Sequence, residues 1–214
     1  MITEGTDKKF ADYISTSDEK WEYGNGVLYN MCKDNPLHND EHVIVGKIWL
    51  IGRSYAAAIE RRKNADVNND DYYYDVVAPK VLSIGKELDL KLEKLNNSKG
   101  LIIDDIEDVL STHKFLLDAF YDITGLEKRS LASKYLHFHC PDKFFIYDSR
   151  ARSAINKLVK KPDKHMLAGL DSYDPEYADF VCRMLELQEY LDGVTGLLGS
   201  PRRMDSFLLS EVDA

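Results

Sequence analysis

The apolar residues of this chain recur mostly at steps of three and four residues, and few stretches alternate between apolar and polar positions. An α-helix brings residues at such spacings to one face, whereas a half-buried β-strand requires alternation. Glycine and proline are also sparse, at 12 and 6 residues, so few positions break a helix. The pattern therefore predicts an all-α fold.

Several expected helices have marked ends. Asn39 or Asp40 can cap a helix that is apolar on nearly every face, Pro79 suits the first turn of another, and Gly125 is a natural helix stop. Residues 143–147 form a short apolar passage that can be extended, and residues 64–71 are expected to form a loop. The expected helices cover residues 7–13, 26–33, 40–63, 79–95, 105–124, 126–139, 149–161, 173–191 and a last segment from Ser200 or Pro201.

No internal repeat or low-complexity linker divides the chain of 214 residues, of which 44% are hydrophobic. This is enough for one large core. We expect a single all-helical domain over residues 1–214, organised as two interleaved lobes, about 36–125 and 126–214 plus the N-terminal helices.

Charge and apolar runs restrict the function classes. The net charge of −9 argues against a protein held on nucleic acid by its overall field, although a local basic patch is compatible with it. The most apolar stretch, residues 43–59, is interrupted by Lys47 and Arg53, so we expect no membrane role. Three cysteines without paired spacing and an N-terminus unlike a signal peptide predict a cytoplasmic protein.

Residues 121–152 contain the most informative pattern: a helix, a turn with Gly125, a basic helix start at Lys128 and Arg129, an apolar helix, the extended passage and Asp148. Free amides at a helix start beside two cations favour a phosphate. Alternatively, Gly125 is only a helix cap and the two basic side chains are solvated.

This order of elements resembles the helix-hairpin-helix superfamily of base-excision DNA glycosylases. Residues 124–130 match the hairpin, residues 131–138 match its second helix, and Asp148 follows Ala132 by 16 residues, close to the family's spacing. The resemblance implies a two-lobed all-α fold, double-stranded DNA as partner, and hydrolysis of the N-glycosidic bond of a modified or mispaired base. It also implies that Asp148 is catalytic and that the DNA backbone is bound by Gly125, Lys128, Arg129, Ser130 and Lys134.

The chain departs from the family pattern at three points. Leu126 and Glu127 follow Gly125, where the family usually has a second glycine. The family's lyase lysine aligns with Ser130 or Arg129, so the resemblance implies a monofunctional enzyme. No four-cysteine cluster follows, which excludes an iron–sulfur centre, and we expect no cofactor. The alternative is a helical nucleic-acid or protein binding module that kept the fold without catalysis.

Asp148 has two compatible roles. Before Ser149 and Arg150 it is a good N-cap, and as a carboxylate it can stabilise positive charge on a sugar or activate water. Tyr147 beside it can stack on an extruded base, although packing in the core is the general role of such aromatics.

Arg53 and Glu60 form a second candidate constellation. If the helix continues through both, they share a face but lie about 10 Å apart, too far to pair. Each then needs another partner, in an interhelical salt bridge or a polar cleft. Asp148 and Arg150 are candidate partners, and a cleft of this kind is compatible with a small-molecule enzyme as a third hypothesis.

The histidines and cysteines favour no metal site or thiol nucleophile. His137 and His139 are two residues apart and point to different sides of a helix, and Cys140 follows them. The sequence predicts no metal and does not determine the oligomeric state.

Overall fold

The computed structural model describes residues 2–16, 21–62, 71–160, 162, 172–196 and 199–212. These residues form helices and no β-strand, with one isolated bridge between Ile2 and Val159. The all-α prediction is confirmed for this part of the chain. The helices are α1 (Thr6–Thr16), α2 (Glu22–Asp34), α3 (Glu41–Ser54), the π-helical turn η1 (Tyr73–Val77), α4 (Ala78–Asn97), α5 (Ile106–Thr124), α6 (Arg129–His139), α7 (Ser149–Leu158), α8 (Pro175–Thr195) and α9 (Pro201–Val212).

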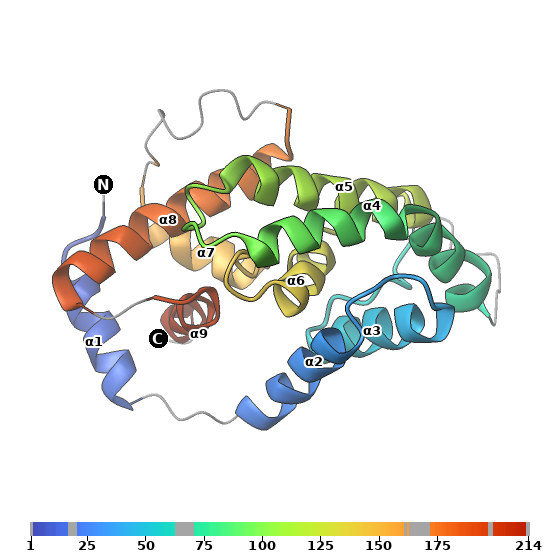
Figure 1. The fold of residues 1–214 in the computed structure, drawn as a ribbon. Helices are drawn as coiled ribbons and strands as arrows, with labels where there is room; N and C mark the ends of the chain where they lie inside the picture. The colour runs from blue at the N-terminus through green and yellow to red at the C-terminus, as the bar shows by residue number, and fades with distance from the viewer. Residues whose placement is uncertain are drawn as a thin grey trace.

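The helices pack in two groups (Figure 1). Helices α1, α7, α8 and α9 pack on one another, and α2 to α6 pack on one another together with η1. The buried apolar residues nevertheless form one continuous core across both groups. Because α6 packs with α2, α3 and α5, the chain passes from one group to the other between α6 and α7. That the groups are lobes that fold as units stays a prediction.

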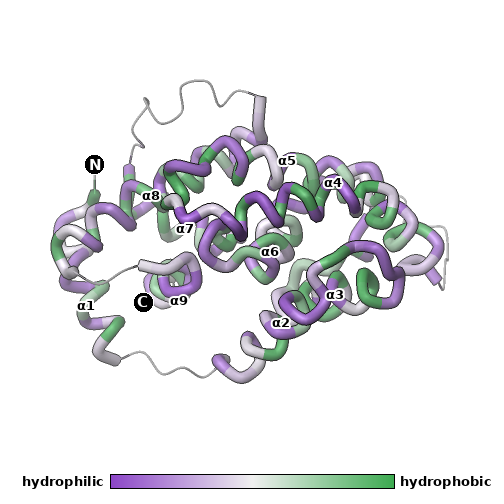
Figure 2. The backbone as a smooth tube through the Cα atoms, in the orientation of Figure 1, coloured by the Kyte–Doolittle hydropathy of each residue, from purple (hydrophilic) through white to green (hydrophobic). Residues whose placement is uncertain are grey.

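Helix α6 is the most enclosed element, and its residues 131–138 are all buried. By contrast, hydrophobic and hydrophilic residues alternate around α4 and α5, as expected for helices with one solvated face (Figure 2). The buried residues of α6 include the polar side chains of Lys134 and His137. Burying such groups costs free energy unless they find partners, so α6 requires polar partners inside the molecule.

The predicted helix caps are present. The carboxylate of Asp40 accepts hydrogen bonds from the backbone N–H groups of His42 and Val43 at 2.8 and 3.2 Å. Gly125 ends α5 in the left-handed conformation, with φ of 66°. Pro79 lies in the first turn of α4. These local predictions are confirmed.

The predicted end of α3 is wrong. The helix stops at Ser54, and the chain reverses through Ala56, whose φ is 51°, with the N–H of Ala57 bonded to the carbonyl of Gly52 at 2.8 Å. The reversal buries Ile59 completely. Burying an isoleucine contributes about 1.5–3 kcal/mol, more than the few tenths of a kcal/mol per residue that helix propensity contributes.

The remaining limits differ by a few residues, as helix ends commonly do. Residues 143–147 are not helical, as predicted. Most of the loop predicted at 64–71, and the end of the predicted helix at Lys63, lie outside the described residues. None of the described helices is long and apolar enough to cross a membrane.

Candidate functional site at the junction of the two helix groups

Asp148 lies where the chain passes from α6 to α7, at the junction of the two groups. Its Oδ1 accepts hydrogen bonds from the N–H groups of Arg150 and Ala151 at 3.0 and 2.9 Å. Its Oδ2 lies 3.4 Å from the Lys134 ammonium, and the side chain is 24% exposed. The predicted N-cap is confirmed, and one oxygen of the carboxylate faces away from its own helix amides.

Lys134 joins several predicted residues in one cluster. Besides Asp148, its Nζ binds the Oγ of Ser130 at 3.0 Å and the carbonyl of Tyr55 at 3.2 Å. Burial lowers the pKa of Lys134, while the charge of Asp148 opposes that shift. The structure therefore brings Ser130, Lys134 and Asp148 together, but the ammonium is turned inward and has oxygen partners from the chain itself.

Two residues of α9, which the sequence analysis missed, complete the polar junction. Asp205 is 3% exposed and lies 3.5 Å from the guanidinium of Arg202. Burial raises the pKa of Asp205 to about 7, opposed by Arg202 and reinforced by Asp148. Its Oδ1 has no hydrogen-bond partner among the described residues. Asp205 is therefore a carboxyl group that is partly protonated near neutral pH and interacts electrostatically with the half-buried carboxylate of Asp148.

A sequence signal for Asp205 exists. Met204, Phe207 and Leu208 are fully buried in α9, and Asp205 lies on the same face, three residues before Leu208. An acidic residue within an apolar helical stripe indicates a buried carboxyl. No comparable signal links α9 to Asp148, because the two are more than 50 residues apart in the chain.

Arg202 connects α9 to α2 and α6. Its guanidinium lies over the rings of Tyr29, Tyr55 and Phe138, with its carbon 5.4–5.7 Å from their centroids. Its Nε donates a hydrogen bond to the hydroxyl of Tyr29 at 3.0 Å. Such cation–π contacts, together with the hydrogen bond, hold the two helix groups together at this point.

Tyr29 and His137 extend this network. The Nδ1 of His137 lies 2.8 Å from the carbonyl of Phe144, and its Nε2 lies 2.6 Å from the Tyr29 hydroxyl. A carbonyl only accepts, so Nδ1 carries the proton and Nε2 accepts from Tyr29. Burial lowers the pKa of His137 to about 3, and the ring is neutral. Both ring nitrogens are thus used within the fold, and the described residues contain no cluster suited to a metal ion.

The hairpin cations predicted to contact phosphate have partners within the protein. Arg129 is paired with Asp174 at 2.7 Å, with Glu127 at 2.6 Å and with Glu176 at 3.0 Å. Lys128 donates to the carbonyl of Ala58 at 3.0 Å. The alternative that both side chains are simply solvated is therefore wrong, and the predicted contact with phosphate stays a prediction.

Tyr147 is 8% exposed and packs edge-on against Phe180, with ring centroids 5.2 Å apart. Its hydroxyl donates to Glu176 at 2.6 Å, and Glu176 also pairs with Arg152. The ring is packed in the core and does not offer an open stacking surface. Arg150 is exposed at the start of α7.

Arg53 and Glu60 pair directly with each other, contrary to the prediction. The reversal after Ser54 brings Glu60 back beside Arg53, so the two residues do not share a continuous helix. The expected pair of Arg53 and Asp148 is not formed, since Arg53 pairs with Glu60 and Asp148 lies 3.4 Å from the ammonium of Lys134. The Arg53 side chain is 60% exposed, so this pair is a surface salt bridge.

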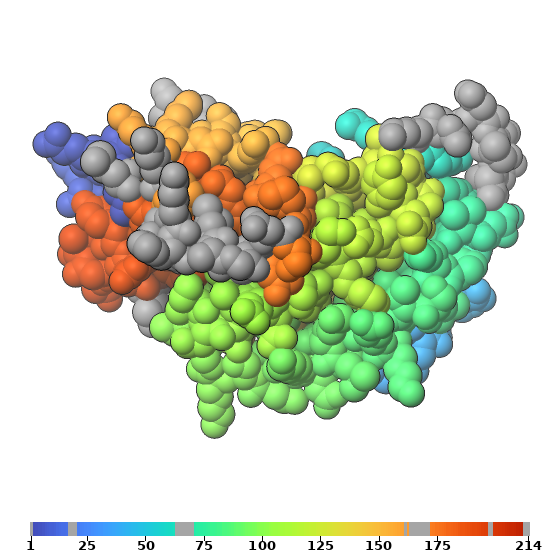
Figure 3. Space-filling model, turned by 90° about the horizontal axis from the view of Figure 1, so that it is seen from above, coloured from blue at the N-terminus to red at the C-terminus, as the bar shows by residue number. Residues whose placement is uncertain are grey.

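The molecular surface is hollowed between α7 with the start of α8 on one side and α5 on the other (Figure 3). These elements belong to the two helix groups that meet at Asp148. Comparison with protein-family models, curated proteins and solved structures finds no match for this chain. Its function must therefore be inferred from these residues.

Proposed function

We propose that this chain is a hydrolase that cleaves the N-glycosidic bond of a modified or mispaired base in DNA, with Asp148 as the catalytic carboxylate. The observation that carries the proposal is the link through Lys134 between Ser130, at the start of the predicted hairpin helix, and Asp148. Ser130, Lys134 and Asp148, which the resemblance assigns to one site, are thus in contact through the Lys134 ammonium.

The geometry of Asp148 suits this chemistry. As the bond between sugar and base breaks, positive charge develops on the sugar, and a fixed carboxylate nearby stabilises that charge. Two backbone N–H groups hold Oδ1 in place, while Oδ2 lies beside Lys134 and is the oxygen that can face a sugar or a water molecule. Asp205 has a pKa raised to about 7 by burial and carries a proton over much of the neutral range.

A second candidate, a binding module without catalysis, is favoured by a different observation. Arg129 has three carboxylate partners within the chain, and Lys128 and Lys134 are bound to oxygens of the protein. Cations engaged in this way contribute little to binding a DNA backbone. Binding of DNA would then depend on the backbone amides of the hairpin.

The test is base release from duplex oligonucleotides, each with one uracil, hypoxanthine, alkylated purine, oxidised guanine or mismatched thymine, followed by alkaline cleavage at the abasic product. We expect release from at least one substrate and a loss of at least 100-fold in Asp148→Asn. Asparagine caps a helix as well as aspartate does, so the fold is retained.

Asp40→Asn is the matched control, because Asp40 caps α3 with the same pair of amide contacts. It is expected to leave base release unchanged. DNA binding with a steep salt dependence but no release would support the binding module. No DNA binding at low salt and no base release would exclude the hydrolase and the DNA-binding module, and would leave a protein-binding module.

A further inference from the structure

A pocket of about 1170 Å³ lies between α2 and α4, away from Asp148. Leu82 and Leu90 of α4, Leu37 of the loop after α2, and Phe138 of α6 line it. The three leucines are 36%, 58% and 50% exposed, in the same order. Sites for small molecules are concave and mostly apolar, with a few polar groups, and have volumes of about 300–1,000 Å³. The pocket is therefore large enough for an extended organic ligand.

The inner wall of the pocket carries a hydrogen-bonded chain from Asp89 through His38 to Tyr135. The Nδ1 and backbone N–H of His38 lie 2.5 and 3.2 Å from the two carboxylate oxygens of Asp89, and Nε2 lies 2.8 Å from the Tyr135 hydroxyl. Nδ1 therefore donates to Asp89 and Nε2 accepts from Tyr135. Both oxygens of Asp89 are thus engaged by His38, which holds this carboxylate in a fixed position at the pocket.

The pocket is held open by a close helix-to-loop contact. A Cβ atom on Gly85 of α4 would overlap the carbonyl oxygen of His38, so only glycine lets the loop lie against α4 here. This contact joins residues 36–39 to the middle of α4 and fixes one end of the pocket. A site formed in advance binds more tightly because less ordering is needed.

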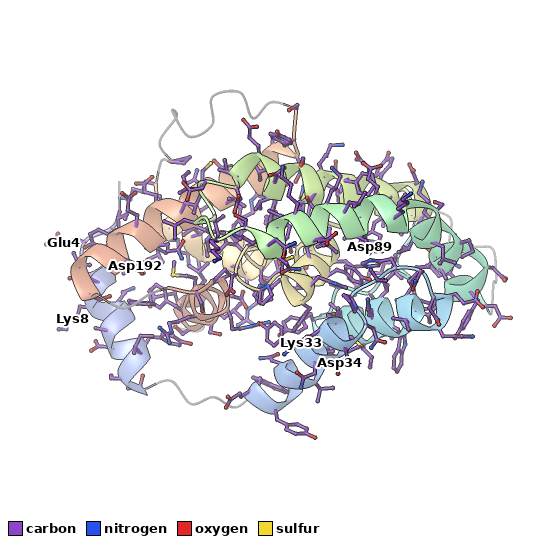
Figure 4. The ribbon with its side chains drawn as sticks, viewed as in Figure 1. Glu4, Lys8, Lys33, Asp34, Asp89 and Asp192 are labelled. Atoms are coloured by element: carbon purple, nitrogen blue, oxygen red, sulfur yellow. The ribbon has the colours of Figure 1, made fainter. Side chains whose placement is uncertain are left out.

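Charged side chains of both signs line the pocket: Lys33 and Lys86, and also Asp89 and Glu93. Lys33, in the last turn of α2, and Lys86, next to Gly85, both lie near the loop at residues 36–39 and line the pocket. Neither ammonium has an ion pair or hydrogen bond to another described residue. Glu93 lies about 10 Å farther along α4. Figure 4 shows Lys33 on α2 and Asp89 on α4, on the two sides of this pocket.

We infer that this pocket binds a small amphipathic carboxylate, whose apolar chain lies against the leucines of α4 and whose anionic head binds between Lys33 and Lys86. The two exposed ammonium groups without partners beside the loop at residues 36–39 are complementary to the charge of the head, and the leucines that line the pocket are complementary to the apolar chain. The site is independent of the function proposed for Asp148.

The experiment is calorimetric titration of the full chain with dodecanoate and with dodecyltrimethylammonium, which share a chain length but carry opposite charges. We expect saturable one-to-one binding of dodecanoate and at least tenfold weaker binding of the cation. The double variant Lys33→Glu and Lys86→Glu is expected to weaken dodecanoate binding by about tenfold or more. Lys8→Glu is the control, because Lys8 is an exposed lysine of α1, in the other helix group (Figure 4).

Leu90→Glu tests the apolar wall. Since Leu90 is 58% exposed, this change is expected to leave folding intact and to abolish dodecanoate binding. The inference would be overturned if the wild type bound both amphiphiles with equal affinity. It would also be overturned if the double variant bound dodecanoate like the wild type. Either result would show that the pocket recognises the apolar chain and not the charge of the head. Absence of saturable binding to the wild type would also overturn it.

Discussion

The junction around Asp148 and the pocket between α2 and α4 use charge in opposite ways. At the junction, Arg129 has three carboxylate partners and Lys134 binds three oxygens of the chain. At the pocket, Lys33 and Lys86 have no such partner among the described residues. A buried cation must be paired because its desolvation is costly, whereas an exposed one is stable in water alone.

This difference between the junction and the pocket shows that a cluster of basic residues in the sequence does not by itself indicate a binding site. The basic residues after Gly125 attract attention in the sequence, and the fold uses most of their hydrogen-bonding capacity itself. The lysines of the pocket look unremarkable in the sequence, yet they retain capacity for a ligand. A site is therefore better recognised by charges that the fold leaves unpaired than by charges that are merely clustered.

The largest expected effect is the loss of unfolding free energy when the buried ion pairs of Arg129 at the junction are removed. Arg129→Ala removes the guanidinium from Asp174, whose side chain is only 4% exposed, and from two further carboxylates. Loss of one partner of a buried pair costs about 3–5 kcal/mol of unfolding free energy. Lys33→Ala, on the exposed rim of the pocket, is expected to change it by less than about 0.5 kcal/mol. Urea denaturation measures both, and similar losses in the two variants would contradict the comparison.

The next effect is the pH dependence of stability through Asp205. Its pKa is about 7 in the folded state, against the ordinary value of 3.8, so the folded protein holds a proton that the unfolded chain releases. Stability through this group is therefore highest at low pH and falls as the pH rises from about 4 to about 7. The charged groups that act on the pKa of Asp205 are Arg202, Lys134 and Arg150, which lower it, and Asp148, which raises it.

Asp205→Asn is expected to remove this loss, which is on the order of 3 kcal/mol between pH 4 and pH 8. Thermal or urea unfolding of both proteins across that range gives the difference. Buried neutral histidines act in the opposite direction, since the pKa values of His38 and His137 are lowered to about 4 and about 3 and stability through them is lost as the pH falls below about 6.5. They are common to both proteins, so parallel pH profiles would contradict the role of Asp205.

A smaller effect concerns the pocket. Gly85→Ala forces the loop that carries His38 away from α4 and is expected to cost about 1–3 kcal/mol, as overpacking generally does, and to weaken dodecanoate binding. Gly46→Ala in α3 is the control, since a Cβ there meets nothing within 4 Å, and it is expected to stabilise the protein by about 0.5–1 kcal/mol. Stabilisation by both changes would show that the loop adapts and that the pocket is not held open by Gly85.

The smallest effect concerns Asp148 as a cap. Asp148→Ala and Asp40→Ala are each expected to cost about 1 kcal/mol, because each removes a side chain that accepts two backbone hydrogen bonds. Asn at either position is expected to cost less than about 0.5 kcal/mol. If Asp148→Ala loses more unfolding free energy than Asp40→Ala, the difference measures the contribution of the contact between Asp148 and the Lys134 ammonium. A difference above about 3 kcal/mol would show that Asp148 is chiefly a structural residue.

Local chemistry made several features predictable from the sequence. The spacing of apolar residues predicts the helices, and Asp40, Gly125 and Asp148 mark helix ends through contacts within a few residues. The end of α3 could not be predicted in this way, because burial of Ile59 by distant parts of the core outweighs the helix propensity of the alanines before it. The pairing of Arg53 with Glu60 depends on that reversal and was missed for the same reason.

By itself, the amino-acid sequence determined the all-helical architecture, the caps and the apolar faces, since these depend on backbone hydrogen bonds and periodicity over a few residues. Only the tertiary structure decided that Arg129 pairs with three carboxylates and that the charge of Asp148 raises the pKa of Asp205. It also decided that Lys33 and Lys86 line one pocket. Electrostatic energies and desolvation depend on distance and burial, and residues far apart in the chain acquire both only when the helices pack.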